Sequence, residues 1–292
     1  MKKAAPFFVL LAGILWGMIG IYVRNFQAQG FTSLEIVVVR TLVTAVVLFL
    51  VLLFYNPALL KIRLRDLWCF IGTGVLSIVF FNYCYFKAIT LTSLSVAAVL
   101  LYTAPAIVMM LSAVLFRERI TSVKVVALFA TVLGCVFVTG LSGATGRLSV
   151  GGILVGLGAG LGYALYSIFG RYALERGYSS LTISFYTFLL ASFAILPMAD
   201  LKIIYETCTS DTGMLFFCLI FGLVSTVLPY LLYTAGLTWM ENSKASIIAS
   251  VEPVAATVLG VLVFQESLTV NQFIGIFLVV GAIVICNVDF DC

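Results

Sequence analysis

The sequence predicts an all-α membrane protein whose ten transmembrane helices form two inverted five-helix repeats around a central cavity. This prediction rests on an extreme composition, on ten apolar segments of membrane-spanning length and on an internal repeat. Of the 292 residues, 63% are hydrophobic and only 10% are charged, and the mean hydropathy is +1.21. Soluble domains carry roughly 25% charged residues, so this chain lacks the polar surface of a water-soluble globule.

The missing residue types narrow the function as well. The chain contains no histidine, which excludes histidine acid–base catalysis and the common zinc sites. The net charge of +4 does not form one basic patch, so nucleic acid is not an expected partner. We therefore expect no cofactor, no metal site and no catalytic residue in this protein, and a lipid bilayer around it.

Ten apolar segments account for nearly the whole chain. A membrane helix needs about 20 mostly apolar residues, and these segments are too long and too irregular for the alternating strands of a membrane barrel. The first one follows Lys2 and Lys3 like a signal peptide, but it has no small-residue cleavage site and is expected to be retained. The predicted spans are 4–23, 33–55, 67–89, 93–115, 122–141, 150–170, 181–198, 213–236, 244–264 and 270–288.

The positions of Lys and Arg predict the orientation, because these residues accumulate in cytoplasmic loops. With the N-terminus inside, eleven fall on the inner side and four on the outer side, which predicts a multi-pass protein of the cell membrane with both termini cytoplasmic. The inner set is Lys2, Lys3, Lys61, Arg63, Arg65, Arg117, Arg119, Lys124, Arg171, Arg176 and Lys244, and the outer set is Arg24, Lys87, Arg147 and Lys202.

The seven cysteines show no CxxC pair. Most of them lie inside predicted spans, where a thiol acts as a small apolar packing group, among them Cys84, Cys135, Cys218 and Cys286. Cys208 falls in a predicted outer loop, and the sequence shows no evident disulfide partner for it.

The two halves of the chain are related by an internal repeat, which we place at 1–142 and 143–292. A shift of 147 residues superimposes Trp16-Gly17 on Tyr163-Ala164 and Arg24 on Arg171, and a shift of 148 later superimposes Pro105 on Pro253. Each half has five spans, an odd number, so the second copy crosses the membrane in the opposite direction. Inverted repeats of this kind place a substrate site near the midplane and work by alternating access.

Two prolines at matching positions indicate where that site lies. Pro105 in span four and Pro253 in span nine each remove a backbone N–H, which frees the carbonyls of Leu101 and Ala249. Paired helix interruptions are the best sequence pointer to a transporter site, and here they would act as hinges. A simple packing kink is the alternative for either proline.

The order of these features resembles the EamA branch of the drug/metabolite transporter superfamily. The similarity rests on the two five-span halves, on Trp16-Gly17, and on Glu252-Pro253 followed by Glu266-Ser267-Leu268-Thr269. The resemblance implies a cavity lined chiefly by spans 1, 3, 4, 6, 8 and 9, and transport of small metabolites, which for many relatives are amino acids. The first half departs from the pattern, because Ala104 stands where the second half has Glu252.

Two charged residues inside spans are candidate substrate contacts. Glu252 is the only carboxylate near the middle of a span, and such groups usually face a cavity or a partner. It would bind a substrate amine or carry a proton, or else stabilise the kink. Arg40 lies about seven residues into span two, where it would bind a substrate carboxylate, contact helix-end carbonyls or pair with Glu35. A spacing of five makes the last pairing unfavourable on a helix.

Aromatic residues on the cavity-type helices complete the predicted substrate site. They are Trp16, Tyr83, Tyr102, Tyr163 and Tyr230, and the repeat pairs Trp16 with Tyr163 and Tyr83 with Tyr230. A buried Tyr or Trp needs a partner for its polar tip, so such a lining favours amphipathic organic solutes over bare ions. Asn82 adds a candidate polar contact, and ordinary packing is the alternative for each aromatic residue.

Four more charged residues are interpreted as structural. Glu118 and Glu266 follow the interrupted helices and are typical of tight turns, and Arg24 and Arg171 end spans one and six at opposite membrane faces. Compensation of the helix C-terminus explains the two arginines better than a role as gate charges.

These features together predict a secondary transporter of small organic metabolites, with amino acids as the favoured class, acting as an exporter or facilitator. No P-loop is present, so the chain itself does not use ATP. The alternatives are a membrane enzyme for lipid-linked substrates, although its short loops lack acidic clusters, and a non-transporting sensor or scaffold subunit. The expected partners are a small-molecule substrate and the bilayer, with the protein a monomer or weak homodimer.

Overall fold

The computed structural model describes residues 2–140, 149–209 and 211–287. The predicted boundary at 142–143, the predicted outer charge Arg147 and the last residue of the predicted spans 122–141 and 270–288 lie outside this part. Within it, ten helical segments are long and apolar enough to cross a membrane, which confirms the predicted number of spans.

The first five spans occupy the first half of the chain. Spans one, three and four are each built from more than one helical piece. The elements are α1 (Ala5–Gly17), α2 (Ile19–Ala28), α3 (Ser33–Tyr55), α4 (Leu67–Ile71), a π-helical segment (Gly72–Val79), α5 (Phe80–Leu91), α6 (Leu94–Leu101), α7 (Ala104–Leu115) and α8 (Ser122–Thr139).

The second half repeats this arrangement with one addition, a short helix between spans seven and eight that the sequence did not predict. The elements are α9 (Val150–Glu175), α10 (Ser180–Ile195), α11 (Leu201–Cys208), α12 (Thr212–Gly222), a π-helical segment (Leu223–Val227), α13 (Leu228–Leu237), α14 (Asn242–Ala249), α15 (Glu252–Phe264) and α16 (Val270–Asn287).

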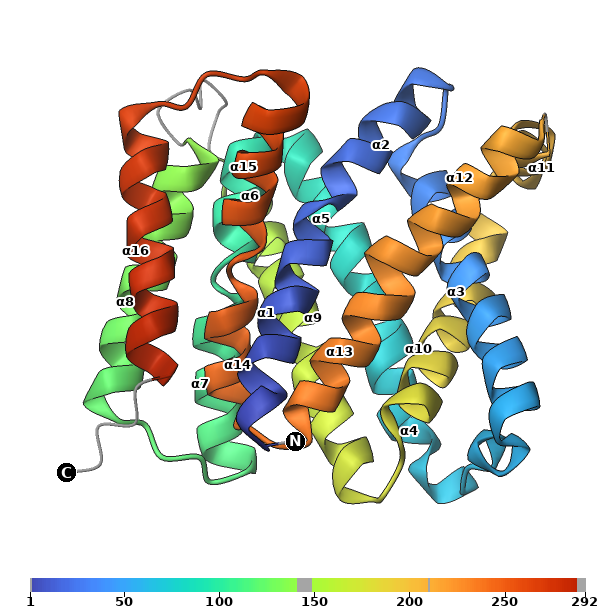
Figure 1. Cartoon of the computed structure of the whole chain (residues 1–292), viewed down its shortest axis with the longest axis horizontal. Coiled ribbons are helices and arrows are strands. Elements are labelled where there is room, and N and C mark those ends of the chain that lie inside the picture. Colours follow the sequence, from blue (N-terminus) through green and yellow to red (C-terminus); the bar gives the residue numbers. More distant parts are fainter. Residues whose placement is uncertain (1, 141–148, 210, 288–292) are drawn as a thin grey trace.

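The molecule has two membrane faces, which we name after two glutamates. The Glu266 face, at the upper end of Figure 1, carries the turn between α2 and α3, the turn between α5 and α6, and the turn between α15 and α16. The Glu118 face, at the lower end, carries the turn between α7 and α8 and the turn between α13 and α14.

Spans four and nine are both interrupted beside the predicted prolines. The break between α6 and α7 falls at Tyr102 and Thr103, and the break between α14 and α15 falls at Ser250 and Val251, 148 residues later. Span one is also broken, at Met18, whereas its repeat counterpart α9 is continuous. The repeat is therefore closest to symmetric at the two proline breaks.

The helices pack in pairs around a centre formed by α1, α9, α13 and the broken spans. Helix α8 packs on α16, α5 on α9, α1 on α13 and α3 on α10, and Figure 1 shows the α8–α16 pair at one edge of the molecule. Glycines allow some of these close approaches, since an added Cβ at Gly162 of α9 would lie 2.9 Å from the backbone of Phe81 in α5. Small residues thus explain the glycine-rich sequence of α9.

Half of the described α-helices begin with a polar cap that satisfies free backbone N–H groups. Thr32 and Glu35 form a capping box at the start of α3, with the Glu35 carboxylate accepting from the Thr32 N–H and hydroxyl at 2.6 and 2.8 Å. This pairing leaves Glu35 turned toward the helix end, and it is not the partner of Arg40. Thr269 and Gln272 make the matching contacts before α16.

Candidate functional site

A cavity of about 480 Å³ lies between the two halves and reaches the Glu266 face. Arg24 and Gln27 at the end of α2 and Leu94 at the start of α6 line its mouth, and all three are exposed. Toward the middle of the protein Trp16, Tyr163 and Glu252 line the cavity. This geometry corresponds to a transporter open on one side.

Arg40 reaches this cavity from α3, although span two was not among the expected cavity helices. Arg40 is only 7% exposed, and its Nε has no hydrogen-bond partner within the described part of the chain. The Tyr230 hydroxyl lies beside the guanidinium group. A buried cation with an unused donor beside a cavity is a candidate contact for an anion, because an unpaired buried charge is costly.

Glu252, the first residue of α15, faces the same cavity from the opposite half of the protein. The Tyr163 hydroxyl donates a hydrogen bond to Glu252 Oε2 over 3.3 Å. The charges of Glu252 and Arg40 are close enough to act on one another, yet the two described side chains are not joined by an ion pair. The cavity therefore presents an acidic and a basic group with space between them.

The floor of the cavity is a layer of aromatic rings. Trp16 packs against Tyr163, Tyr230 and Tyr233 with ring centroids 6.2, 5.1 and 5.4 Å apart. A second, small cavity of about 20 Å³ lies next to this layer and is lined by Ser77 and Ser167 as well as by the rings. The aromatic layer separates the large cavity from the Glu118 face.

Two hydrogen bonds between α9 and α13 close the protein further toward the Glu118 face. Tyr166 and Thr234 share one at 2.7 Å, and Ser167 and Tyr233 share another at 2.7 Å. All four residues are buried. A path from the cavity to the Glu118 face would have to break these contacts.

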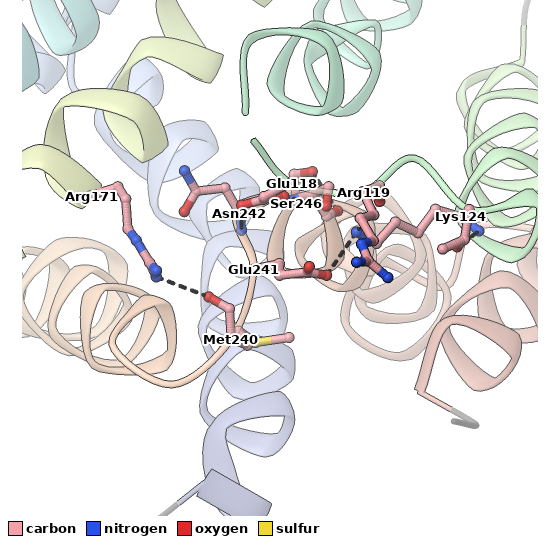
Figure 2. Close-up of polar contacts among 10 residues, drawn as sticks. Glu118, Arg119, Lys124, Arg171, Met240, Glu241, Asn242 and Ser246 are labelled. Atoms are coloured by element: carbon pink, nitrogen blue, oxygen red, sulfur yellow. Dashed lines mark hydrogen bonds and ion pairs between the residues drawn. The ribbon is translucent and has the colours of Figure 1, made fainter. Parts of the chain in front are cut away.

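A polar cluster seals the Glu118 face itself, as Figure 2 shows. The Glu118 carboxylate accepts from the N–H of Asn242 at 2.8 Å and from the N–H and hydroxyl of Ser243 at 3.2 and 2.5 Å. Arg171 donates to the carbonyls of Leu237 and Met240, at 2.8 and 3.3 Å. The sequence predicted only local roles for Glu118, in a tight turn, and for Arg171, at the end of a helix. Those predictions were incomplete, since each residue also joins two separate spans.

An ion pair between a buried lysine and a partly exposed glutamate completes this cluster. Lys124, whose side chain is 4% exposed, lies 2.7 Å from the Glu241 carboxylate and also donates to the Arg119 carbonyl at 2.7 Å. It connects the start of α8 to the turn before α14 (Figure 2). No feature of the sequence marks this pair, because both residues look like ordinary loop charges.

The structure brings six of the seven predicted substrate-site residues to the large cavity: Trp16, Arg40, Tyr102, Tyr163, Tyr230 and Glu252. Tyr83 is not among the lining residues, and it is 59% exposed on the outside of α5. Its neighbour Asn82 is buried and lines the cavity instead.

Tyr83 lies outside the cavity because the register between the two repeats changes by one residue. The π-helical segments of spans three and eight end at Val79 and Val227, which are 148 residues apart. The pairing of Tyr83 with Tyr230 by a shift of 147 is therefore wrong by one residue, and Tyr230 corresponds to Asn82. Tyr85, which the sequence analysis did not select, also lines the cavity.

Comparison with known proteins agrees with this architecture. The sequence profile of the EamA-like transporter family matches residues 3–140 and 150–288. An uncharacterized transporter of Archaeoglobus fulgidus is 31% identical over 284 residues, covering 96% of this chain and 93% of its own. The threonine/homoserine exporter RhtA of Escherichia coli is 27% identical and covers 69% of this chain and 65% of its own.

A solved structure shows the same fold. It superimposes with a TM-score of 0.79 at 17% identity and covers 98% of this chain and 97% of its own. Two family matches that together span most of the sequence, with a relative above 30% identity over nearly the full length, establish the relationship. The chain belongs to the EamA-like transporter family of membrane transporters.

Proposed function

We propose that this protein is a secondary transporter of amino acids, which it moves by alternating access between its two halves. The observation that carries the proposal is the placement of Arg40 and Glu252 in one cavity as unpaired opposite charges. A free amino acid carries a carboxylate and an ammonium group separated by one carbon. Arg40 would bind the carboxylate and Glu252 the ammonium group, and each buried charge would then be neutralised.

The remaining lining sets the preference for the side chain of the substrate. Ile36, Phe86, Ile89 and Phe221 are apolar and line the same cavity. Such a surface suits a neutral amino acid better than a charged one, because burial of a third charge against apolar side chains is costly. RhtA is named as an exporter of threonine and homoserine, two neutral amino acids, and this is compatible with the proposed class.

The cellular arrangement follows from charge and sequence. Eleven Lys and Arg residues are predicted to lie on the side of the Glu118 face and four on the other side. This excess supports a cell-membrane location with the Glu118 face in the cytoplasm. Because no P-loop is present, the energy source is a gradient or exchange, and the protein is an exporter or facilitator without enzymatic activity.

The test is competition for uptake into proteoliposomes that contain the purified full chain. A labelled neutral amino acid is offered together with the unlabelled amino acid, the amine that lacks its carboxylate, or the acid that lacks its ammonium group. Only the intact amino acid should compete strongly. One charge-assisted hydrogen bond contributes about 1.5–3 kcal/mol, so each analogue should compete about tenfold to a hundredfold more weakly.

Two variants assign the ends of the substrate. Arg40→Gln should reduce discrimination against the amine, and Glu252→Gln should reduce discrimination against the acid. The exposed charges Arg65 and Glu206 provide matched controls, and Arg65→Gln and Glu206→Gln should keep the original pattern. Absence of saturable amino-acid uptake, or an unchanged competition pattern in both cavity variants, would contradict the proposal.

A further inference from the structure

The turns that follow the two broken spans are the same structure built twice. Arg117 and Gln265, 148 residues apart, have φ values of 56° and 55°, which non-glycine residues rarely adopt. In both turns the N–H of the following glutamate donates over 3.2 Å to a carbonyl of the preceding helix, that of Ser112 for Glu118 and that of Gly260 for Glu266. The two glutamates are therefore presented identically on opposite faces.

Their side chains nevertheless have different partners. Glu118 binds the first turn of α14 through two backbone N–H groups and the Ser243 hydroxyl. Glu266 instead accepts from Arg24 at 2.7 Å, in a pair whose side chains are 54% and 50% exposed. An exposed pair of this kind contributes little, because water and salt screen it.

The first half of the chain contains residues equivalent to the partners of Glu118. By the shift of 148, Asn242 and Ser243 of α14 correspond to Leu94 and Ser95 of α6. The hydroxyl that binds Glu118 thus has an equivalent in Ser95. The N–H groups of Leu94 and Ser95 have no acceptor among the described residues, and Leu94 is 62% exposed at the cavity mouth.

We propose that Glu266 is the gate residue of the open face: when that face closes, its carboxylate leaves Arg24 and binds the start of α6 through the Leu94 and Ser95 N–H groups and the Ser95 hydroxyl. In the same step Glu118 releases α14, and the other face opens. This proposal rests on the alternating access stated above, and it assigns the groups that exchange.

Arg24 exchanges partners with the same symmetry. Its repeat counterpart Arg171 donates to the carbonyls of Leu237 and Met240 on the closed face. The corresponding carbonyls on the open face are those of Ile89 and Thr92, at the end of α5. Arg24, once released by Glu266, donates to these two carbonyls. Both members of the exposed ion pair, Arg24 and Glu266, thereby acquire new partners within the closed face.

One contact of the closed face has no counterpart. Lys124 and Glu241 form an ion pair, whereas Gln272 and Ser93 occupy the corresponding positions on the other face. The closed Glu118 face is therefore held by one more charge interaction than a closed Glu266 face would be. This additional interaction stabilises the state seen here.

Amide hydrogen exchange of the full chain in lipid nanodiscs tests the proposal without knowledge of the substrate. In the unaltered protein the amides of Asn242 and Ser243 should be protected and those of Leu94 and Ser95 should exchange rapidly. Glu118→Gln should reverse both: exchange at 242–243 should rise about tenfold, and exchange at 94–95 should fall, because the population moves to the other state.

The double variant Glu118→Gln/Glu266→Gln separates the gate from a general loosening. It should keep the fast exchange at 242–243 but lose the protection gained at 94–95. Ser95→Ala should weaken that protection in the Glu118→Gln background, whereas Glu206→Gln should change nothing. Unchanged exchange at 94–95 in Glu118→Gln, or equal protection in the double variant, would overturn the proposal.

These outcomes are independent of the substrate assignment. Reciprocal exchange in a protein that does not take up amino acids would leave the gate in place and remove the proposed substrate. Amino-acid uptake with the competition pattern expected above, in a protein without reciprocal exchange, would leave the substrate in place and remove the gate.

Discussion

Gly13 of α1 lies against the carbonyl oxygen of Ala249, the backbone group that Pro253 frees. A Cβ added at Gly13 would lie only 2.8 Å from this oxygen. The repeat counterpart Gly160 of α9 lies in the same way against the other break, with 3.0 Å from its added Cβ to the Leu100 oxygen and 2.7 Å to Thr103 Oγ1. Each broken span is therefore packed against a glycine of the opposite half.

Replacement of these glycines should therefore destabilise the protein. Gly13→Ala and Gly160→Ala force a methyl group into contact with backbone that cannot move away easily, and overpacking of this kind costs about 1–3 kcal/mol. We expect a lower thermal unfolding temperature in detergent for both variants. Gly170→Ala is the matched control within α9, because nothing lies within 4 Å of its added Cβ. Equal unfolding temperatures for Gly160→Ala and Gly170→Ala would contradict this view of the breaks.

The hydrogen bond from Tyr163 to Glu252 should matter for substrate affinity. Tyr163→Phe removes the donor and leaves the ring, so Glu252 loses a group that orients it toward the cavity. A hydrogen bond contributes about 0.5–1.5 kcal/mol net, which predicts a rise in KM of about twofold to tenfold. Uptake kinetics measure this change, with Tyr205→Phe on the exposed face of α11 as the control. An unaltered KM would remove Tyr163 from the site.

Much of the fold was predictable because bilayer thickness and helix geometry are strict constraints. Ten apolar segments, two prolines and the repeated landmarks sufficed to predict the number of spans, and the prolines marked both helix breaks. The break of span one at Met18 could not be predicted, since no proline or polar residue marks it. Helix α11 also went unpredicted, because the short segment between spans seven and eight is amphipathic rather than apolar.

The site was predictable only where a residue type is unusual in its surroundings. Glu252 and Arg40 stand out because charges inside spans are rare. Tyr83 was selected as a substrate contact, and Asn82 was not ranked among these contacts. The prediction assumed a regular α-helix, whereas the π-helical segment before α5 adds a residue and rotates the faces of α5. The contact of Glu118 with α14 escaped prediction since it joins residues 124 positions apart.

A clamp at the Glu118 face gives a testable pH dependence. Tyr178, in the turn between α9 and α10, donates to Asp66 at 2.7 Å and accepts from the Arg63 N–H at 3.0 Å. Burial, and then the hydrogen bond to the Asp66 carboxylate, raise the pKa of Tyr178 above its ordinary value. The folded protein therefore binds the phenol proton more tightly than the unfolded chain does.

The stabilisation from this clamp is complete below the pKa of tyrosine in the unfolded chain, about 10. It is lost as the pH rises through the higher pKa of the folded state. Tyr178→Phe should lower the unfolding temperature at neutral pH, and the gap to the unaltered protein should shrink above about pH 10. Thermal unfolding across this range measures it, with Tyr205→Phe as a control that shows no gap. A gap of constant size at all pH values would contradict the role of the hydroxyl.

Cys208 and Cys218 are free cysteines that lie close together. The Sγ of Cys208 lies 3.2 Å from Sγ of Cys218, where the sequence showed no evident disulfide partner and assigned Cys218 to packing. A disulfide requires about 2.05 Å, so a small displacement of the end of α11 relative to α12 brings the two sulfurs within bonding distance. Both lie toward the Glu266 face, the proposed outer side, where conditions in a cell favour oxidation.

Treatment with the thiol oxidant diamide should therefore join Cys208 to Cys218. The two thiols lose two protons and two electrons, which reduce the azo bond of the reagent. The number of thiols alkylated after denaturation should fall by two, and a peptide that links the two residues should appear in the digest. Cys208→Ser should abolish the change, whereas Cys69→Ser, a buried cysteine near the other face, should not. An unchanged thiol count after treatment with diamide would show that the packing of α11 and α12 holds the sulfurs apart.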